Sequence, residues 1–350
     1  MTYNGAGNRT ALTASGASSY NGTTSHSYDY GQTANPALNR SQVTGESSTR
    51  VSYTNTFSYD GGTSTGPGNP TSFKGGTNSF NADNQQTGTG FGYDGAGNPT
   101  TYMGAALAFD PENRMTSDST GGQADGYSGD GLRAWKQSAG SKTYFLYDGT
   151  QPVSEYSGAG TLLATNTLGA SGLVSRHTSV GSTFYAFDER GNASQRLSRA
   201  GAVATSELYD GYGSRTGTAA QADPFGYGAQ AGYYTDTETG LILCAHRFYD
   251  PAAGRWLTHD PIGCRGGVNL YGYVGNNPGN RWDPSEFWSV TIGVSGTGVI
   301  GLPIGIGGSA GGGIVIGDGG IGVYGSIIGG VGIGVVGSVG ASFGWSIMVP

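Results

Sequence analysis

Residues 224–287 read PFGYGAQAGYYTDTETGLILCAHRFYDPAAGRWLTHDPIGCRGGVNLYGYVGNNPGNRWDPSEF, and turn-forming pairs such as Asp-Pro, Asn-Pro and Thr-Gly recur at short intervals. Between them lie short runs rich in Tyr, Phe and Trp, which favour strands joined by tight turns. We therefore expect a compact all-β end piece from 225 to 287. Within it, strands at 240–250 and 254–258 should form a hairpin around residues 250–254.

The composition of the whole chain favours the same fold class. Its 350 residues include 68 glycines and 22 tyrosines, and only 12% are charged, which does not describe a helical enzyme. The net charge of −7 and the pI near 5.0 argue against nucleic acid as the main partner, because phosphate binding needs a basic face. Cys244 and Cys264 are the only cysteines of the sequence, so neither a disulfide framework nor a cysteine metal site is predicted.

Residues 1–224 carry an imperfect repeat in which Tyr or Phe precedes Asp or Asn and a glycine-rich turn. Copies begin at Tyr3, Tyr93, Phe109, Phe187 and Tyr209. Repetition on this scale is typical of architectures in which no single unit is stable alone. The Asp-Gly and Gly-Asn pairs supply the positive φ that short hairpin loops need. We expect a meander of β-hairpins without chemistry of its own, with weak order in residues 1–100 and irregular loops at 61–90.

Residues 288–350 form a third, glycine-rich segment in which Asp318 is the one charged residue. Because it has no His, Cys, Lys, Arg or Glu, we expect no enzymatic activity in it. Alternation of glycine with β-branched residues, and a turn at 317–320, favour a β-structure that finishes or plugs the fold. A membrane-active segment is the alternative, because the uncharged run 319–350 is long enough to span a bilayer as a helix, although its glycine content disfavours a helix.

The order and spacing of motifs in 224–287 closely resemble the core domain that ends the repeat region of RHS/YD-repeat proteins. The matching segments are Thr239-Gly240-Leu241, Arg247-Phe248-Tyr249-Asp250-Pro251, Gly254-Arg255-Trp256, Asp260-Pro261-Ile262-Gly263, Asn269-Leu270-Tyr271, Asn276-Asn277-Pro278 and Asp283-Pro284. Proteins of this family are the large β-shells of bacterial polymorphic toxins and the C subunits of insecticidal toxin complexes. The resemblance implies that the hairpins of 1–224 coil into a spiralling sheet around a cavity and end in an RHS core cap at 225–287.

In the resembled family the core domain is a self-cleaving aspartic peptidase, which cuts just after an Asp-Pro-x-Gly-Leu motif. Carried over by position, Arg247, Asp260 and Asp283 would be the catalytic residues, and the cut would follow Phe287. Two carboxylates held close cannot both ionise, so one serves as acid and the other as base, while an arginine anchors one of them. This chain has Glu286 and Phe287 where the family has Gly-Leu. Because Asp-Pro is also a common turn pair, a purely structural role of these residues is the alternative.

His246 and His259 directly precede Arg247 and Asp260, but no further ligands stand at matching spacing. We therefore expect packed or surface histidines and no metal, and nothing predicts a cofactor. No signal peptide is visible, and the chain begins within a repeat unit, so we expect a fragment of a longer protein.

The sequence predicts the C-terminal part of a secreted or cell-surface RHS-repeat shell protein of the polymorphic-toxin type, which encloses its own C-terminal segment and releases it by autoproteolysis. The alternative is a non-enzymatic, adhesive YD-repeat protein of the cell surface with an inert core. Beside the enclosed segment, the resemblance implies an immunity protein or the secretion machinery as candidate partners.

Overall fold

The computed structural model describes residues 1–3, 8–16, 22–29, 42–49, 52–60, 68–216, 223–265, 267–283, 290–291, 309–317 and 320–328. For residues 14–16, 22–29, 290–291, 309–317 and 320–328 only the backbone is described. Glu286, Phe287 and the expected cut therefore lie outside the described residues, as does most of the segment 288–350.

Antiparallel strands, each paired with the next along the chain, build the repeat region into two large sheets. The seven-stranded sheet contains β1 (Thr2–Tyr3), β2 (Arg9–Gly16), β3 (Gly22–Asp29), β4 (Gly45–Ser48), β5 (Tyr53–Tyr59), β6 (Pro70–Phe73) and β7 (Gly76–Thr77). The thirteen-stranded sheet contains β10 (Gly92–Tyr93), β11 (Pro99–Tyr102), β12 (Ala105–Phe109), β13 (Met115–Asp118), β14 (Gln123–Tyr127), β15 (Arg133–Ser138), β16 (Ser141–Asp148), β17 (Gln151–Ser157), β18 (Leu162–Gly169), β19 (Gly172–Thr178), β20 (Gly181–Phe187), β21 (Ala193–Leu197) and β22 (Val203–Ser206). Two short hairpins, β8 (Ser79–Phe80) with β9 (Gln86–Thr87) and β23 (Leu208–Tyr209) with β24 (Arg215–Thr216), complete the region. The predicted all-β fold of consecutive hairpins is confirmed.

The repeat motif is a capped hairpin turn. Asp94 Oδ1 accepts hydrogen bonds from the backbone N–H of Ala96 (2.9 Å) and of Asn98 (2.8 Å). Gly97 takes the left-handed position at φ +86°, and the strand register shifts at the preceding Tyr93, which marks a β-bulge. The side chains of Asp110 and Asp188 accept the same two backbone hydrogen bonds in their own turns.

The positive φ falls on the Gly-Asn pair, as predicted, but at Asp94 it does not fall on the Asp-Gly pair. Gly95 is not left-handed, whereas Gly97 is. The reason is that the Asp side chain caps the first residues of a longer turn, so the left-handed residue comes two positions later. Asn113 fills that position at φ +64° in the Asp110 turn, because Asn tolerates this conformation better than other side chains.

Residues 68–90 differ from the irregular loops expected there, since they contain strands β6 to β9. Amide side chains hold them in place. Asn69 Nδ2 donates to Asp60 Oδ2 (2.8 Å), and Gln86 Nε2 donates to Asn78 Oδ1 (3.0 Å). The weak order expected of residues 1–100 as a whole stays a prediction.

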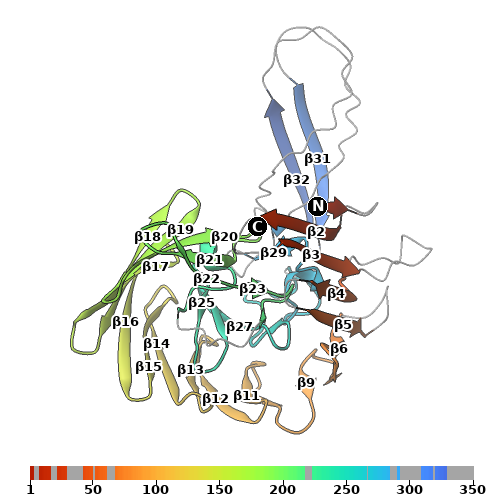
Figure 1. Cartoon of the computed structure of the whole chain (residues 1–350). Coiled ribbons are helices and arrows are strands. Elements are labelled where there is room, and N and C mark those ends of the chain that lie inside the picture. The colour runs from red at the N-terminus through yellow and green to blue at the C-terminus, as the bar shows by residue number, and fades with distance from the viewer. Residues whose placement is uncertain are drawn as a thin grey trace.

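Residues 223–283 lie inside the curve of the two sheets, which Figure 1 shows following one another around them. Their four-stranded sheet contains β25 (Tyr234–Thr235), β26 (Ile242–Cys244), β27 (Arg247–Asp250) and β28 (Arg255–Trp256). The helices of the described residues are single 3-10 turns, namely η2 (Ala229–Ala231), η3 (Gly263–Arg265) and η4 (Val274–Asn276). The position inside the curve differs from the expected end piece that caps the hairpins.

The hairpin around residues 250–254 is confirmed, but the single strand expected at 240–250 is wrong. Strands β26 and β27 pair with each other, with Cys244 opposite Arg247. Ala245 turns the chain between them in a left-handed conformation at φ +55°. Alanine rarely adopts this conformation, so the sequence pattern did not indicate a turn there.

Three apolar clusters join the sheets to the core, the name used from here on for residues 223–283. The first contains Val43, Phe57, Phe73, Tyr209, Tyr212, Tyr227, Tyr233, Ile242, Cys244, Tyr249, Trp256, Tyr273 and Val274. The second contains Tyr102, Leu107, Met115, Leu241, Leu243, Phe248 and Leu257. The third contains Phe145, Leu173, Tyr185, Ala193, Phe225, Ala229 and Tyr234. Burying one large apolar side chain contributes about 1.5–3 kcal/mol, so the sheet and the core stabilise each other.

An ion pair links the first sheet to the β20–β21 turn of the second. Arg9 Nη1 of β2 lies 2.6 Å from Glu189 Oε1 in the β20–β21 turn, and the Arg9 side chain is 1% exposed. The backbone N–H of Arg9 also donates to Asn280 Oδ1 of the core (2.6 Å). Strand β2, the β20–β21 turn and the end of the core therefore meet at one point.

At the end of the core, β29 (Arg281–Trp282) pairs with β30 (Val290–Thr291), and beyond the core β31 (Ser309–Gly317) pairs with β32 (Gly320–Ile328). The β31–β32 hairpin extends away from the rest of the described structure (Figure 1). Gly317 pairs with Gly320 in this hairpin, and the predicted β-structure of the segment 288–350 stays a prediction. Within the described ranges, none of the helices has the length and apolarity of a membrane span.

Candidate functional site

The structure brings Arg247 and Asp260 together. Arg247 begins strand β27 and is 4% exposed, and its guanidinium lies over the ring of Trp256 at 4.1 Å. Arg247 Nη2 lies 3.4 Å from Asp260 Oδ2, so an ion pair joins the two side chains. This contact is what the sequence predicts for an arginine that anchors a carboxylate.

Hydrogen bonds hold both the side chain and the backbone of Asp260. Its Oδ1 accepts a hydrogen bond from the N–H of Ile262 (3.0 Å), and its backbone N–H donates to the carbonyl of Leu270 (2.9 Å). Burial raises the pKa of Asp260 above its ordinary value, although Arg247 and the Ile262 N–H act in the opposite direction. Asp260 therefore keeps a proton to higher pH than an exposed aspartate does.

Asp283 lies at the end of strand β29 and is 6% exposed. Its backbone carbonyl accepts a hydrogen bond from the hydroxyl of Tyr233. Burial raises the pKa of Tyr233 and of Tyr273, and the charge of Asp283 contributes in the same direction for both. The structure thus places Asp283 beside a tyrosine pair, and Asp260 beside Arg247.

The cysteines and histidines of the core lie in different surroundings. Cys244 is buried and Cys264 is exposed, and they do not form a disulfide. The ring of His259 lies 4.7 Å from the ring of Tyr271. Among the residues that the structure describes, no group of three or more His, Cys, Asp and Glu side chains could hold a metal ion.

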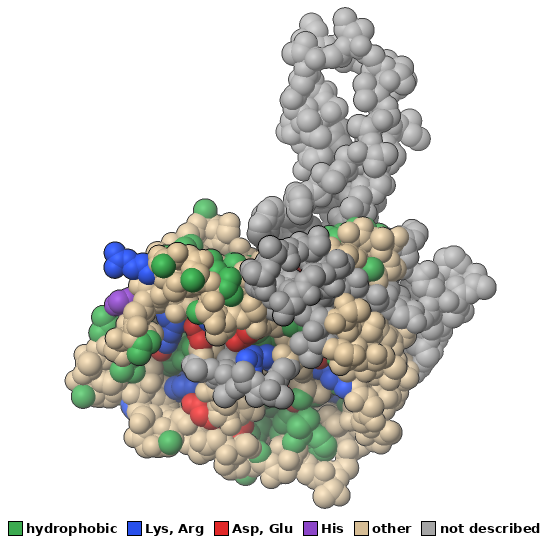
Figure 2. Space-filling view, viewed as in Figure 1, with side chains coloured by type: hydrophobic (Ala, Val, Ile, Leu, Met, Phe, Trp, Pro, Cys, Tyr) green, Lys and Arg blue, Asp and Glu red, His purple; other side chains and the backbone are tan. Residues whose placement is uncertain are grey.

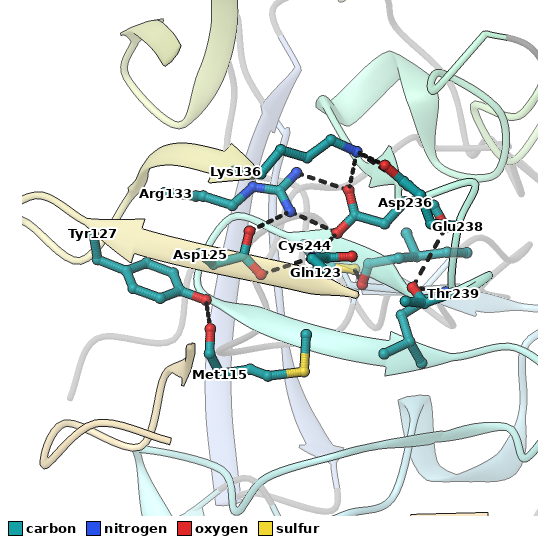
Figure 3. A network of polar contacts seen from close by, with 12 residues as sticks. Met115, Gln123, Asp125, Tyr127, Arg133, Lys136, Asp236, Glu238, Thr239 and Cys244 are labelled. Atoms are coloured by element: carbon teal, nitrogen blue, oxygen red, sulfur yellow. Dashed lines mark hydrogen bonds and ion pairs between the residues drawn. The ribbon is translucent and has the colours of Figure 1, made fainter. Parts of the chain in front are cut away.

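A buried polar network that sequence reasoning missed joins strands β14 and β15 to the core (Figure 3). Asp236, which is 0% exposed, lies at its centre. Arg133 reaches both oxygens of Asp236, at 2.6 Å to Oδ2 and 3.0 Å to Oδ1. Lys136 Nζ lies 3.0 Å from Asp236 Oδ1, and Gln123 Nε2 donates to Asp236 Oδ2 at 2.7 Å.

The charges of this network stabilise one another. Burial disfavours the ionised form of Asp236, but Arg133 and Lys136 outweigh that cost and lower its pKa. Burial raises the pKa of the neighbouring Asp125 to about 6, against the effect of Arg133 at 3.3 Å. The arrangement is suited to fixing the sheet on the core rather than to reacting with a substrate.

One feature of the local sequence indicates a structural role for Asp236, and no such feature indicates its partners. Asp236 closes the turn that contains the family motif Thr239-Gly240-Leu241, since its carbonyl accepts the N–H of Gly240 at 2.7 Å. Arg133 lies 103 positions earlier in the chain, so only the folded structure reveals the pair. Figure 2 shows Lys, Arg, Asp and Glu side chains gathered in a hollow of the molecular surface on the side that faces the viewer.

None of the protein-family models matches the chain. Over 141 residues the chain is 34% identical to "Double-stranded DNA deaminase toxin A" of Burkholderia cenocepacia. The aligned residues make up 39% of this chain and 10% of that protein. Over 56 residues it is 50% identical to "Probable deoxyribonuclease RhsB" of Dickeya dadantii. Here the aligned residues make up 16% of this chain and 4% of that protein. The chain thus spans a tenth or less of the length of these two relatives.

Among solved structures, the chain is similar to the crystal structure of TcdB2-TccC3 without its hypervariable C-terminal region. The TM-score is 0.50 at 20% sequence identity, and the match covers 75% of this chain and 13% of that one. The two therefore share the fold of a β-shell.

Proposed function

This chain belongs to the RHS/YD-repeat proteins with a β-shell fold, and we propose that it is the closing part of such a shell, which cuts itself to release the segment after Phe287. The core lies inside the curve of the strands described here, and we expect further repeats of a longer protein to build the chamber. Relatives named as toxins support export from the cell, with an immunity protein and the secretion machinery as partners.

The contact between Arg247 and Asp260 carries this proposal. Because burial raises the pKa of Asp260, this residue can hold the proton that an acid catalyst donates to the carbonyl oxygen of Phe287. Asp283 would take a proton from the attacking water. Asp283 stands four residues before Phe287, and an extended chain of that length reaches at most about 14 Å. The bond between Phe287 and Trp288 would then break, with a proton passing to the nitrogen of Trp288.

Intact mass measurement of the purified chain tests the proposal. We expect a C-terminal fragment that begins at Trp288, and we expect Asp283→Asn to abolish it, because an amide cannot take the proton from water. Asp250→Asn is the matched control, since Asp250 is also a buried aspartate before a proline and accepts a hydrogen bond from Tyr102 (2.8 Å). The control variant should still be cut at the natural site.

Glu286 and Phe287, which stand where the family has Gly-Leu, allow a second test of the proposed cleavage. Restoring the family ending with Glu286→Gly and Phe287→Leu should speed cleavage, if the natural residues hinder the approach of the chain. A chain that stays uncut in both the natural and the restored forms would show that the core is not a peptidase.

The stacking of Arg247 on Trp256 favours a second candidate, a non-enzymatic surface protein with an inert core. A cation over an indole stabilises a fold without any chemistry. Arg247→Met separates the two functions, because methionine still covers the ring but cannot anchor Asp260. Loss of cleavage at unchanged thermal stability supports the peptidase, whereas an inert core gives no fragment in either the natural or the variant form.

A further inference from the structure

A repeat turn of the shell is docked on the residue next to Asp260. In the turn between β10 and β11, the left-handed Gly97 faces the ring of His259. A Cβ atom at position 97 would lie 2.5 Å from His259 Nε2 and 2.9 Å from Nδ1, distances that real Cβ atoms do not adopt. The absence of a side chain at Gly97 is therefore what admits the His259 ring.

Tyr271 contacts the same turn. Its hydroxyl donates to the carbonyl of Gly97 at 2.7 Å, and its ring lies 6.2 Å from Tyr93, the aromatic residue of this repeat. His259 and Tyr271, which contact the turn, are sequence neighbours of Asp260 and Leu270. The N–H of Asp260 donates a hydrogen bond to the carbonyl of Leu270. The turn therefore contacts the sequence neighbours of both residues that form this hydrogen bond.

A second repeat turn meets the residue before Arg247. Gly131, left-handed at φ +86° in the turn between β14 and β15, faces His246. A Cβ atom at Gly131 would lie 2.9 Å from His246 Cδ2. Two turns of the shell therefore contact the two histidines that directly precede Arg247 and Asp260.

We propose that the turn at residues 94–98 is a positioning element for Asp260, acting through His259 and Tyr271, so that self-cleavage proceeds only while this part of the shell is docked on the core. The inference rests on the proposed function and adds a condition to it. A shell protein would gain from this coupling, because the enclosed segment would not be released from an unassembled wall.

The chain offers a matched pair of variants to test it. Gly201 occupies the same place in the turn between β21 and β22, with φ +78° and the same pair of backbone hydrogen bonds. A Cβ atom there would meet nothing within 4 Å. Gly97→Ala and Gly201→Ala therefore introduce similar backbone strain, but only the first pushes on the core.

We expect Gly97→Ala to slow cleavage at least about tenfold, since misplacement by about 1 Å can cost about a hundredfold in rate. Gly201→Ala should cleave at the natural rate. His259→Ala removes the ring that an alanine at 97 would strike. The double variant Gly97→Ala/His259→Ala should then cleave no more slowly than His259→Ala alone, and this non-additivity shows that Gly97 acts through His259.

Hydrogen exchange provides a readout that does not need cleavage. The amide of Asp260, protected by its bond to Leu270, should exchange faster in Gly97→Ala and be unchanged in Gly201→Ala. If the natural chain is never cut but exchange changes in this way, the peptidase function fails and the positioning contact stands. If Gly97→Ala matches Gly201→Ala in exchange, or slows cleavage additively with His259→Ala, the inference is wrong.

Discussion

Removing the carboxylate of Asp236 should be among the most destabilising changes in the chain. In Asp236→Ala, Arg133 keeps Asp125 at 3.3 Å as a carboxylate partner but loses the two shorter contacts of 2.6 and 3.0 Å. The Arg133 side chain is 1% exposed, so water cannot replace them. Breaking a buried ion pair in this way costs about 3–5 kcal/mol, and we expect a loss of that order in the free energy of unfolding.

Urea unfolding followed by tyrosine and tryptophan fluorescence measures this loss. The control is Glu112→Ala, which removes the Glu112–Arg114 ion pair (3.1 Å) of a glutamate that is 65% exposed. Exposed pairs contribute about 0–1 kcal/mol, so the control should unfold near the natural midpoint. A loss below about 1 kcal/mol in Asp236→Ala would refute the reasoning that this network fixes the sheet on the core.

Two further predictions concern pH and the C-terminal segment. Burial and Asp210 raise the pKa of Glu46 from 4.5 to about 7, against Asn55, the Gly211 N–H and Lys74. Because the folded pKa exceeds the unfolded one, this carboxyl group stabilises the fold below about pH 4.5, and its contribution is lost as the pH rises to about 7; Glu46→Gln should flatten the stability–pH curve over that window. Deleting residues 288–350 should lower the thermal midpoint if the segment finishes the shell, whereas dye leakage from liposomes by the isolated segment would show membrane activity instead.

The features predicted from sequence are those whose physics is local. The Asp94 turn closes within five residues, and its left-handed Gly97 falls on the Gly-Asn pair, one of the two pairs for which the sequence predicts positive φ. The strands that follow alternate in the usual way: on β16, Phe145 is 5% exposed while Leu146 is 55% exposed. Such patterns fix the fold class and the direction of each hairpin.

The features that escaped prediction depend on distant parts of the chain. The partners Arg133 and Asp236 are separated by 103 positions, and no sequence motif indicates that they pair. The place of the core inside the curve follows from the accumulated curvature of many strands, which no single hairpin encodes. Arg247 and Asp260 were predicted as a pair only through the family resemblance, since they stand 13 positions apart with the β27–β28 hairpin turn between them.

The same turn motif serves two purposes, which accounts for its glycine. The Asp side chain closes the hairpin, and the left-handed glycine leaves an open backbone face that a core side chain can approach. Cβ atoms at such positions would meet the core at Gly131, where they face His246, and at Gly213, where they face Tyr227. At Gly201, in the turn between β21 and β22, they would meet nothing within 4 Å. Where the shell touches the core, glycine in these repeats thus serves in two ways, through its φ and through its missing side chain.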